Sequence, residues 1–299
     1  MELSWMNKLR IAAVAVLGLC VIGALAWPLA APVDPLVPVR AWTISPLGTV
    51  ILLLLAFGLG FAGYFIAWPH GREIGVLAVP FGLALWAGRS GPMRVLTQSL
   101  RQPSEREALA FSLRFEPLYW LLLVAAGFAG VLFAQYLRAP SPQRSGDQPT
   151  RSYRNVNTYL TGLLALAATV LVSCFLVGVF VRDVATSRNI TSTQPPIGQI
   201  VFGVTAAFAV AAFLLKKFAD LSYLGPVLGS AFVTGFAQAI YGRAETLRQF
   251  AETRPATFFP HSALTVLPLQ FIAFGTLGSI IGYWLAVRYD WWRKHEALG

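Results

Sequence analysis

The stretch LGTVILLLLAFGLGFAGYFIAW, from Leu47 to Trp68, decides the fold class because it holds no charged residue. A helix of roughly 20 apolar residues crosses the hydrocarbon core of a bilayer, which is about 30 Å thick. Eight charge-free apolar stretches occur in the chain, and all but one reach or nearly reach that length. They are Ile11–Ala31, Leu47–Trp68, Ile74–Ala87, Pro117–Leu137, Tyr159–Val181, Ile197–Leu215, Tyr223–Tyr241 and Leu264–Val287.

The composition indicates that lipid, not water, solvates most of this chain. Hydrophobic residues make up 56% and charged residues 12%, whereas a soluble domain carries about 25% charged residues. A backbone that spans lipid must be helical or form a closed barrel, and these stretches are too long and too uniform for barrel strands. We therefore predict an all-α polytopic transmembrane bundle of about eight segments. The number falls to six if Ile74–Ala87 and Tyr223–Tyr241 are re-entrant, but the second is nearly full length.

A polar interruption at residues 138–158 divides the chain into two halves. It is rich in Pro, Ser, Gly and Arg, which is typical of a flexible linker. The halves, residues 1–137 and 159–299, each hold four apolar segments, with a proline-containing third segment. The fourth helix is expected to open at Pro117 in the first half and at Pro268 in the second. This shared order indicates an internal repeat of four plus four segments, an arrangement known in transporters.

The net charge of +10 arises from 23 Lys and Arg residues against 13 Asp and Glu residues, nearly all of them outside the apolar stretches. Basic loops of this kind usually face anionic lipid headgroups. Nucleic acid is not an expected partner, because no soluble module is long enough to form a groove-reading fold. Two Gly-Arg pairs are each followed by a second arginine at the same offset. The candidate headgroup or anion contacts are therefore Arg89, Arg94, Arg243 and Arg248.

Acids, bases and histidines are absent from all eight stretches. Proton relays and ion-coupled carriers place such groups inside the membrane, and bis-histidine haem sites need paired imidazoles there, so these classes are disfavoured. The remaining polar side chains on the last two helices either line a wet path or hydrogen-bond one helix to another. The candidates for such a path are Thr234, Gln238, Gln270 and Thr276.

Closely spaced glycines in the apolar stretches indicate tight helix packing. The sequence Gly58-Leu-Gly60-Phe-Ala-Gly63 matches the dinucleotide-binding fingerprint, but that fingerprint requires a preceding strand and lies here inside an apolar run. Small residues four apart allow two helix backbones to approach each other. The candidate packing positions in the second half are Gly225, Gly229, Gly278 and Gly282.

The sequence holds no zinc-protease, serine-hydrolase or Walker motif, and we expect no cofactor and no metal. We predict a non-enzymatic multi-pass protein that acts as a membrane scaffold or as a subunit of a membrane complex. Its expected partners are lipids and another membrane protein or a second copy of the chain. The excess of Arg over Lys and the abundant alanine suggest a bacterial inner membrane.

Three alternatives remain open at this point. The main one is a pseudo-symmetric permease or channel for a neutral or anionic small molecule. A lipid-modifying enzyme is less favoured; it would use loop residues, either Arg72 with Glu73 or His261 with Glu252. The apolar stretch that begins at Ile11 also resembles a cleavable signal peptide, although a retained first helix is ordinary in a chain with seven further apolar stretches.

Overall fold

The computed structural model describes residues 5–98, 103–138, 156–181, 195–243, 245–246, 249 and 261–296. All regular elements in these ranges are helical, which confirms the all-α prediction. In the first half they are α1 (Trp5–Gly18), η1 (Leu19–Leu25), α2 (Trp27–Ala30), η2 (Ala41–Thr43), α3 (Pro46–Ile66), α4 (Gly71–Ile74), η3 (Gly75–Leu77), α5 (Ala78–Arg89), α6 (Met93–Gln98) and α7 (Pro103–Arg138). In the second half they are α8 (Val156–Phe180), α9 (Ile197–Ala219), α10 (Leu224–Tyr241), η4 (Ser262–Leu264) and α12 (Pro268–Glu296).

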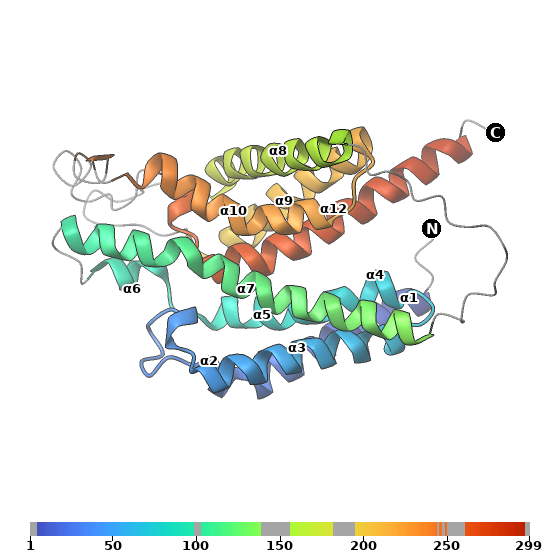
Figure 1. Ribbon diagram of the computed structural model, residues 1–299, viewed down its shortest axis with the longest axis horizontal. Coiled ribbons are helices and arrows are strands. Elements are labelled where there is room, and N and C mark those ends of the chain that lie inside the picture. The colour runs from blue at the N-terminus through green and yellow to red at the C-terminus, as the bar shows by residue number, and fades with distance from the viewer. Residues whose placement is uncertain are drawn as a thin grey trace.

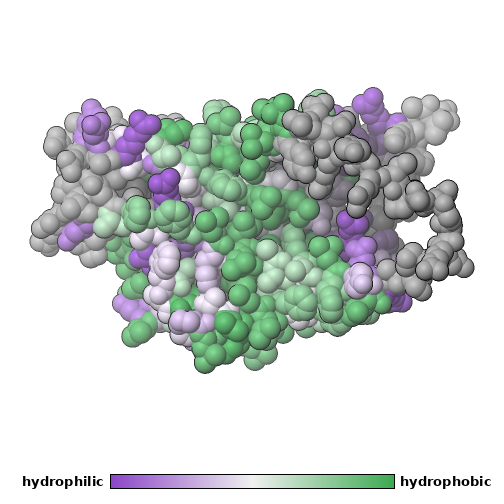
Figure 2. Space-filling model, viewed as in Figure 1, coloured by the Kyte–Doolittle hydropathy of each residue, from purple (hydrophilic) through white to green (hydrophobic). Residues whose placement is uncertain are grey.

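The chain is a multi-pass integral membrane protein. In the described ranges, 7 helices are long and apolar enough to cross a bilayer, and they lie side by side in one bundle (Figure 1). Figure 2 shows apolar side chains gathered in a broad central belt, with polar side chains towards both ends of the molecule. Large apolar side chains such as Leu54, Phe175 and Phe202 are exposed on the outside of the bundle. Such a surface is stable against acyl chains rather than against water.

An eighth helical stretch accompanies the seven. The short segment predicted at Ile74–Ala87 extends in the structure from Gly71 to Arg89, through α4, η3 and α5. At 1.5 Å per residue it covers about 28 Å, close to the thickness of the hydrocarbon core. It runs back across the bundle between the other helices, and both ends of the chain lie at the same end of the molecule (Figure 1).

The first helix contains a wide turn. Residues Leu19–Leu25 form a π-helix, and the N–H of Ala26 donates to the carbonyl of Val21, five residues earlier, at 2.9 Å. This turn packs against α5, where a side chain at Gly23 would meet Leu85 and one at Gly82 would meet Ile22. The π-helical turn therefore lies at a contact between two helices.

The prediction that a helix opens at Pro117 is wrong. α7 is one continuous helix of 36 residues that begins at Pro103 and carries Pro117 in its interior. A proline removes one backbone N–H and strains the preceding turn, but it does not always end a helix when neighbouring groups support that turn. In the second half, by contrast, α12 begins at Pro268 as predicted.

Among the helix pairs that approach each other backbone to backbone are α3 with α7 and α9 with α12. An added Cβ at Gly60, Gly130, Gly278 or Gly282 would collide with the carbonyl oxygen of Gly127, Phe57, Thr205 or Ala209, respectively. In each half, the pair is formed by the second long helix and the last one. The division into residues 1–137, 138–158 and 159–299, and the duplication behind it, stay predictions.

Candidate functional site

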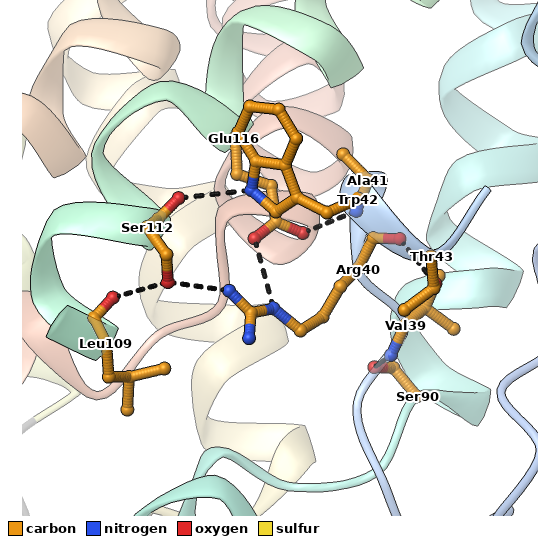
Figure 3. Close-up of polar contacts among 9 residues, drawn as sticks. All are labelled: Val39, Arg40, Ala41, Trp42, Thr43, Ser90, Leu109, Ser112 and Glu116. Carbon is orange, nitrogen blue, oxygen red and sulfur yellow. Dashed lines mark hydrogen bonds and ion pairs between the residues drawn. The ribbon is translucent and has the colours of Figure 1, made fainter. Parts of the chain in front are cut away.

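The most densely bonded polar group in the described ranges lies where the loop before α3 meets α7 (Figure 3). It consists of Arg40, Ala41, Trp42, Ser112 and Glu116, which we name the Arg40–Glu116 cluster. The backbone N–H of Ala41 donates to Oε1 of Glu116 at 2.9 Å, and Nε of Arg40 lies 3.8 Å from Oε2. Nη2 of Arg40 also donates to Oγ of Ser112 at 2.7 Å. The cluster therefore links the loop before α3 to α7 through one ion pair and two hydrogen bonds.

Burial explains why Glu116 needs these partners. Its side chain is 1% exposed, whereas that of Arg40 is 21% exposed. An ionised carboxylate that leaves water is stable only when a cation and hydrogen-bond donors replace its hydration. Here the guanidinium of Arg40 supplies the cation and the N–H of Ala41 supplies one donor, whereas Oε2 of Glu116 has no hydrogen-bond partner among the described residues. The side chain of Arg40 is in turn partly exposed.

Further hydrogen bonds extend the cluster to neighbouring segments. The indole Nε1 of Trp42 donates to the carbonyl of Ser112 at 3.2 Å. The backbone N–H of Val39 donates to Oγ of Ser90, just after α5, at 3.0 Å. The loop of residues 37–45 is therefore held against both α5 and α7. The buried carboxylate, paired with an arginine and bonded to the loop backbone, thus positions the loop on α7 (Figure 3).

Sequence reasoning missed Glu116 because the apolar stretch was taken to begin one residue later, at Pro117. A spacing signal was present, since Ser112 and Glu116 are four residues apart and share one face of a helix. The partner, Arg40, lies 76 positions away in a loop, and pairing across that distance depends on the tertiary fold.

The predicted headgroup contacts are placed unevenly. Nη1 of Arg89 donates to the carbonyl of Gly23 at 3.3 Å, and its guanidinium lies 5.9 Å from the ring centre of Trp27. Arg243 is exposed, and its Nε donates to the carbonyl of Ala239 at 3.0 Å. The side chain of Arg94 and the whole of Arg248 lie outside the described residues. Only Arg89 and Arg243 can therefore be placed, and a surface formed by all four arginines stays a prediction.

Three of the four residues proposed for a polar path are buried: Thr234, Gln270 and Thr276 are at most 2% exposed. Gln238 is half-buried. Oε1 of Gln270 accepts from the backbone N–H of Leu267 at 3.0 Å, at the start of α12. The hydroxyls of Thr234 and Thr276 have no hydrogen-bond partner among the described residues.

The predicted packing glycines differ in their surroundings. Gly278 and Gly282 lie against the backbone of α9, as described above, and an added Cβ at Gly229 would meet the side chain of Thr169 on α8 at 2.7 Å. Gly225 faces open space. Three of the four glycines therefore lie at helix-packing positions, and Gly225 does not.

A second group of contacts surrounds His261, which lies shortly before the start of α12. Its ring stacks on Tyr241 with centroids 4.3 Å apart, and its Nδ1 accepts from the N–H of Ala263 at 3.1 Å. Burial lowers the pKa of His261 below its usual 6.5. His261 and Cys174 line one surface pocket of about 400 Å³. Within the described ranges no three His, Cys, Asp or Glu side chains gather as a metal site.

Of the two residue pairs weighed for a lipid-modifying enzyme, only Arg72 with Glu73 lies wholly within the described residues. Glu252, the expected partner of His261, lies outside the described residues. Arg72 and Glu73 lie in α4, towards the end of the bundle that carries both chain ends (Figure 1).

Comparison with known proteins adds no relative: no family model, no curated protein and no solved structure matches this chain.

Proposed function

We propose that this protein is a non-enzymatic scaffold, or a subunit of a larger complex, in a bacterial inner membrane. In this proposal it acts through the outer faces of its helices, by binding lipids and another membrane protein or a second copy of itself.

The use of polar groups inside the second half supports the proposal. Several buried side chains of this half bond to the backbone of their own helix. They are Thr169 with the carbonyl of Ala165 at 2.8 Å, Ser230 with Val227 at 2.6 Å and Ser279 with Gly275 at 2.7 Å. A hydroxyl bonded in this way is less available to replace the hydration of a passing solute. The tight contacts of Gly278 and Gly282 with α9 also leave no space between those two helices.

Photo-crosslinking in native membranes tests the scaffold directly. A photoreactive residue at Val16, which is 57% exposed on α1, should crosslink to a protein of defined mass. The matched control is the same residue at Val14, which is 0% exposed on the same helix and should react only within the chain. Capture of lipid alone at Val16, and also at the exposed Leu164 on α8, would contradict the proposal.

A second candidate, a permease or channel for a neutral or anionic small molecule, is favoured by one observation. The hydroxyls of Ser173, Thr234 and Thr276 are buried and have no partner among the described residues. They come from α8, α10 and α12, and α10 packs against both of the others. Unpaired buried hydroxyls are unfavourable, and a bound water or solute would satisfy them.

Flux into proteoliposomes separates the two candidates. The scaffold proposal predicts that glycerol and chloride enter proteoliposomes no faster than they enter protein-free liposomes. Flux at least tenfold above that background, abolished by Thr276→Val and unaffected by the exposed control Thr43→Val, would favour the permease. Thr276 is 0% exposed and so tests the interior, whereas Thr43 lies at the surface.

A further inference from the structure

A long apolar groove runs along the outside of the bundle between α7 of the first half and α8 and α10 of the second. Its volume is about 550 Å³. Leu118 of α7, Leu163 of α8 and Phe232 of α10 line it, and each is 47% to 65% exposed. Gly235 and Ala167 form part of its floor, so small side chains leave the space open. We name it the α7–α8–α10 groove.

One charged side chain, Arg114, borders this groove. It lies in the first turn of the membrane-crossing part of α7, which begins at Phe111, and so at headgroup depth. Its guanidinium lies 5.7 Å from the ring centre of Phe115, and no described acidic side chain pairs with it. The groove therefore combines an apolar body with an uncompensated cation at one end.

The Arg40–Glu116 cluster fixes the direction of Arg114. Residues two apart on a helix point roughly 200° apart, because each residue turns the helix by about 100°. Ser112 and Glu116 face the cluster, so Arg114 between them faces the other side of α7, where the groove lies.

We propose that the α7–α8–α10 groove binds one anionic phospholipid, with an acyl chain along the apolar groove and the phosphate at Arg114. The shape and the charge distribution match that ligand: aliphatic side chains accept the chain, and a guanidinium donates to phosphate oxygens in a bidentate manner. A zwitterionic lipid gains less at Arg114, because its own cation offsets the attraction of the phosphate. This assignment is independent of the choice between scaffold and permease.

Native mass spectrometry of the detergent-purified protein, titrated with phosphatidylglycerol or phosphatidylcholine, tests the proposal. We expect wild type to retain the first phosphatidylglycerol more tightly than phosphatidylcholine. Arg114→Gln should weaken the first phosphatidylglycerol about fivefold, the effect of one interfacial charge, and Arg114→Lys should restore part of it. The charge control is Arg288→Gln, an exposed arginine of α12 that does not border the groove and should have no such effect.

A second pair of variants tests the groove without changing charge. Gly235→Leu should fill it and weaken retention of both lipids, and an added Cβ at Gly235 meets nothing within 4 Å, so the fold should tolerate it. Gly58→Leu, at an equally open glycine on α3, is the matched control. Inorganic phosphate at millimolar concentration should not displace the lipid, since it lacks the chain.

Three outcomes would overturn the proposal. The first is equal retention of the two lipids by wild type. The second is a loss in Arg288→Gln as large as that in Arg114→Gln, which would indicate a general charge effect. The third is a wild-type dimer that Gly235→Leu dissociates while lipid retention stays unchanged, which would assign the groove to a second copy of the chain.

Discussion

At the scale of single residues, the pairing of Glu116 with Arg40 shows how a charge is tolerated beside an apolar span. The carboxylate is held by one backbone N–H and one guanidinium, and the arginine side chain is partly exposed. Because Glu116 is almost fully buried while Arg40 is partly solvated, loss of the arginine should be more harmful than loss of the acid.

A double-mutant cycle tests this asymmetry. Arg40→Met leaves a buried carboxylate without a cation and should lower the free energy of unfolding by about 2 kcal/mol, below the 3–5 kcal/mol of a fully buried pair because Arg40 is partly exposed. Glu116→Gln keeps an acceptor for Ala41 and should cost about 1 kcal/mol. The double variant should lose less than the sum. Unfolding by SDS in mixed micelles measures all three, and strictly additive losses would argue against coupling.

His261 should make stability depend on pH. Its folded-state pKa is lowered by burial, so the unfolded chain binds a proton more readily. Stability is therefore full above pH 6.5 and falls as the pH drops below it, and protonation of Nδ1 would also remove the acceptor of the Ala263 N–H. Thermal unfolding followed between pH 7.5 and pH 5.5 should show this decline in wild type and a smaller one in His261→Gln. An unchanged decline in the variant would exclude His261 as its origin.

At the scale of helices, two glycine-mediated pairs organise the bundle. In α3 with α7 and in α9 with α12, glycines permit a backbone approach that any larger residue would prevent. Without a hydrophobic driving force inside the lipid, close van der Waals contact of this kind is a main source of helix association. These pairs should therefore be more sensitive to small increases in side-chain volume than the lipid-facing sides of the same helices.

Two glycines of α3 give a matched comparison. Gly60 lies against the backbone of Gly127 on α7, whereas Gly58, two residues earlier, faces open space. Gly60→Ala should lower the free energy of unfolding by about 1–3 kcal/mol through overpacking. Gly58→Ala should leave it unchanged or slightly raised, as alanine favours helix. SDS unfolding of the two variants measures the difference, and equal effects would show that the contact is not tight.

The sequence predicts most helices but not how each one begins or packs. Charge-free runs locate the spans because lipid excludes charge. They do not locate the exact residues at which each span begins and ends. Pro117 was misread as a helix start because support for a proline turn comes from tertiary neighbours, which periodicity does not reveal. Likewise, Gly58 and Gly60 look alike in sequence, and only the neighbouring helix distinguishes them.

At the scale of the whole molecule, the helical stretch from Gly71 to Arg89 decides the topology. Together with the 7 longer helices it gives an even number of crossings, in agreement with the common position of both chain ends in Figure 1. The short apolar core at Ile74–Ala87 left this open in the sequence. In the structure the helix continues through flanking residues that are mostly exposed, whereas most of Ile74–Ala87 is buried among the other helices.

Sidedness of labelling tests this topology. In a variant with Cys20→Ser and Cys174→Ala, single cysteines at Asp34 and Ser222 provide exposed sites on two loops. A membrane-impermeant maleimide should label them from opposite sides of the membrane. Tags at the two chain ends should be accessible from the Ser222 side. If the two chain-end tags were instead accessible from opposite sides of the membrane, the stretch Gly71–Arg89 would not cross the bilayer.

The π-helical turn at Leu19–Leu25 makes the spacing within the first span unusually critical. Its extra residue offsets everything on the N-terminal side by about 100° relative to a regular helix. Removing one residue from this turn would let the backbone revert to ordinary winding and would swing Trp5–Gly18 around its own axis. Gly18, now against the carbonyl of Ala78, would turn aside, and a bulkier neighbour would be driven into α5. An insertion or deletion in this turn should therefore be tolerated far less than a substitution on the lipid-facing surface.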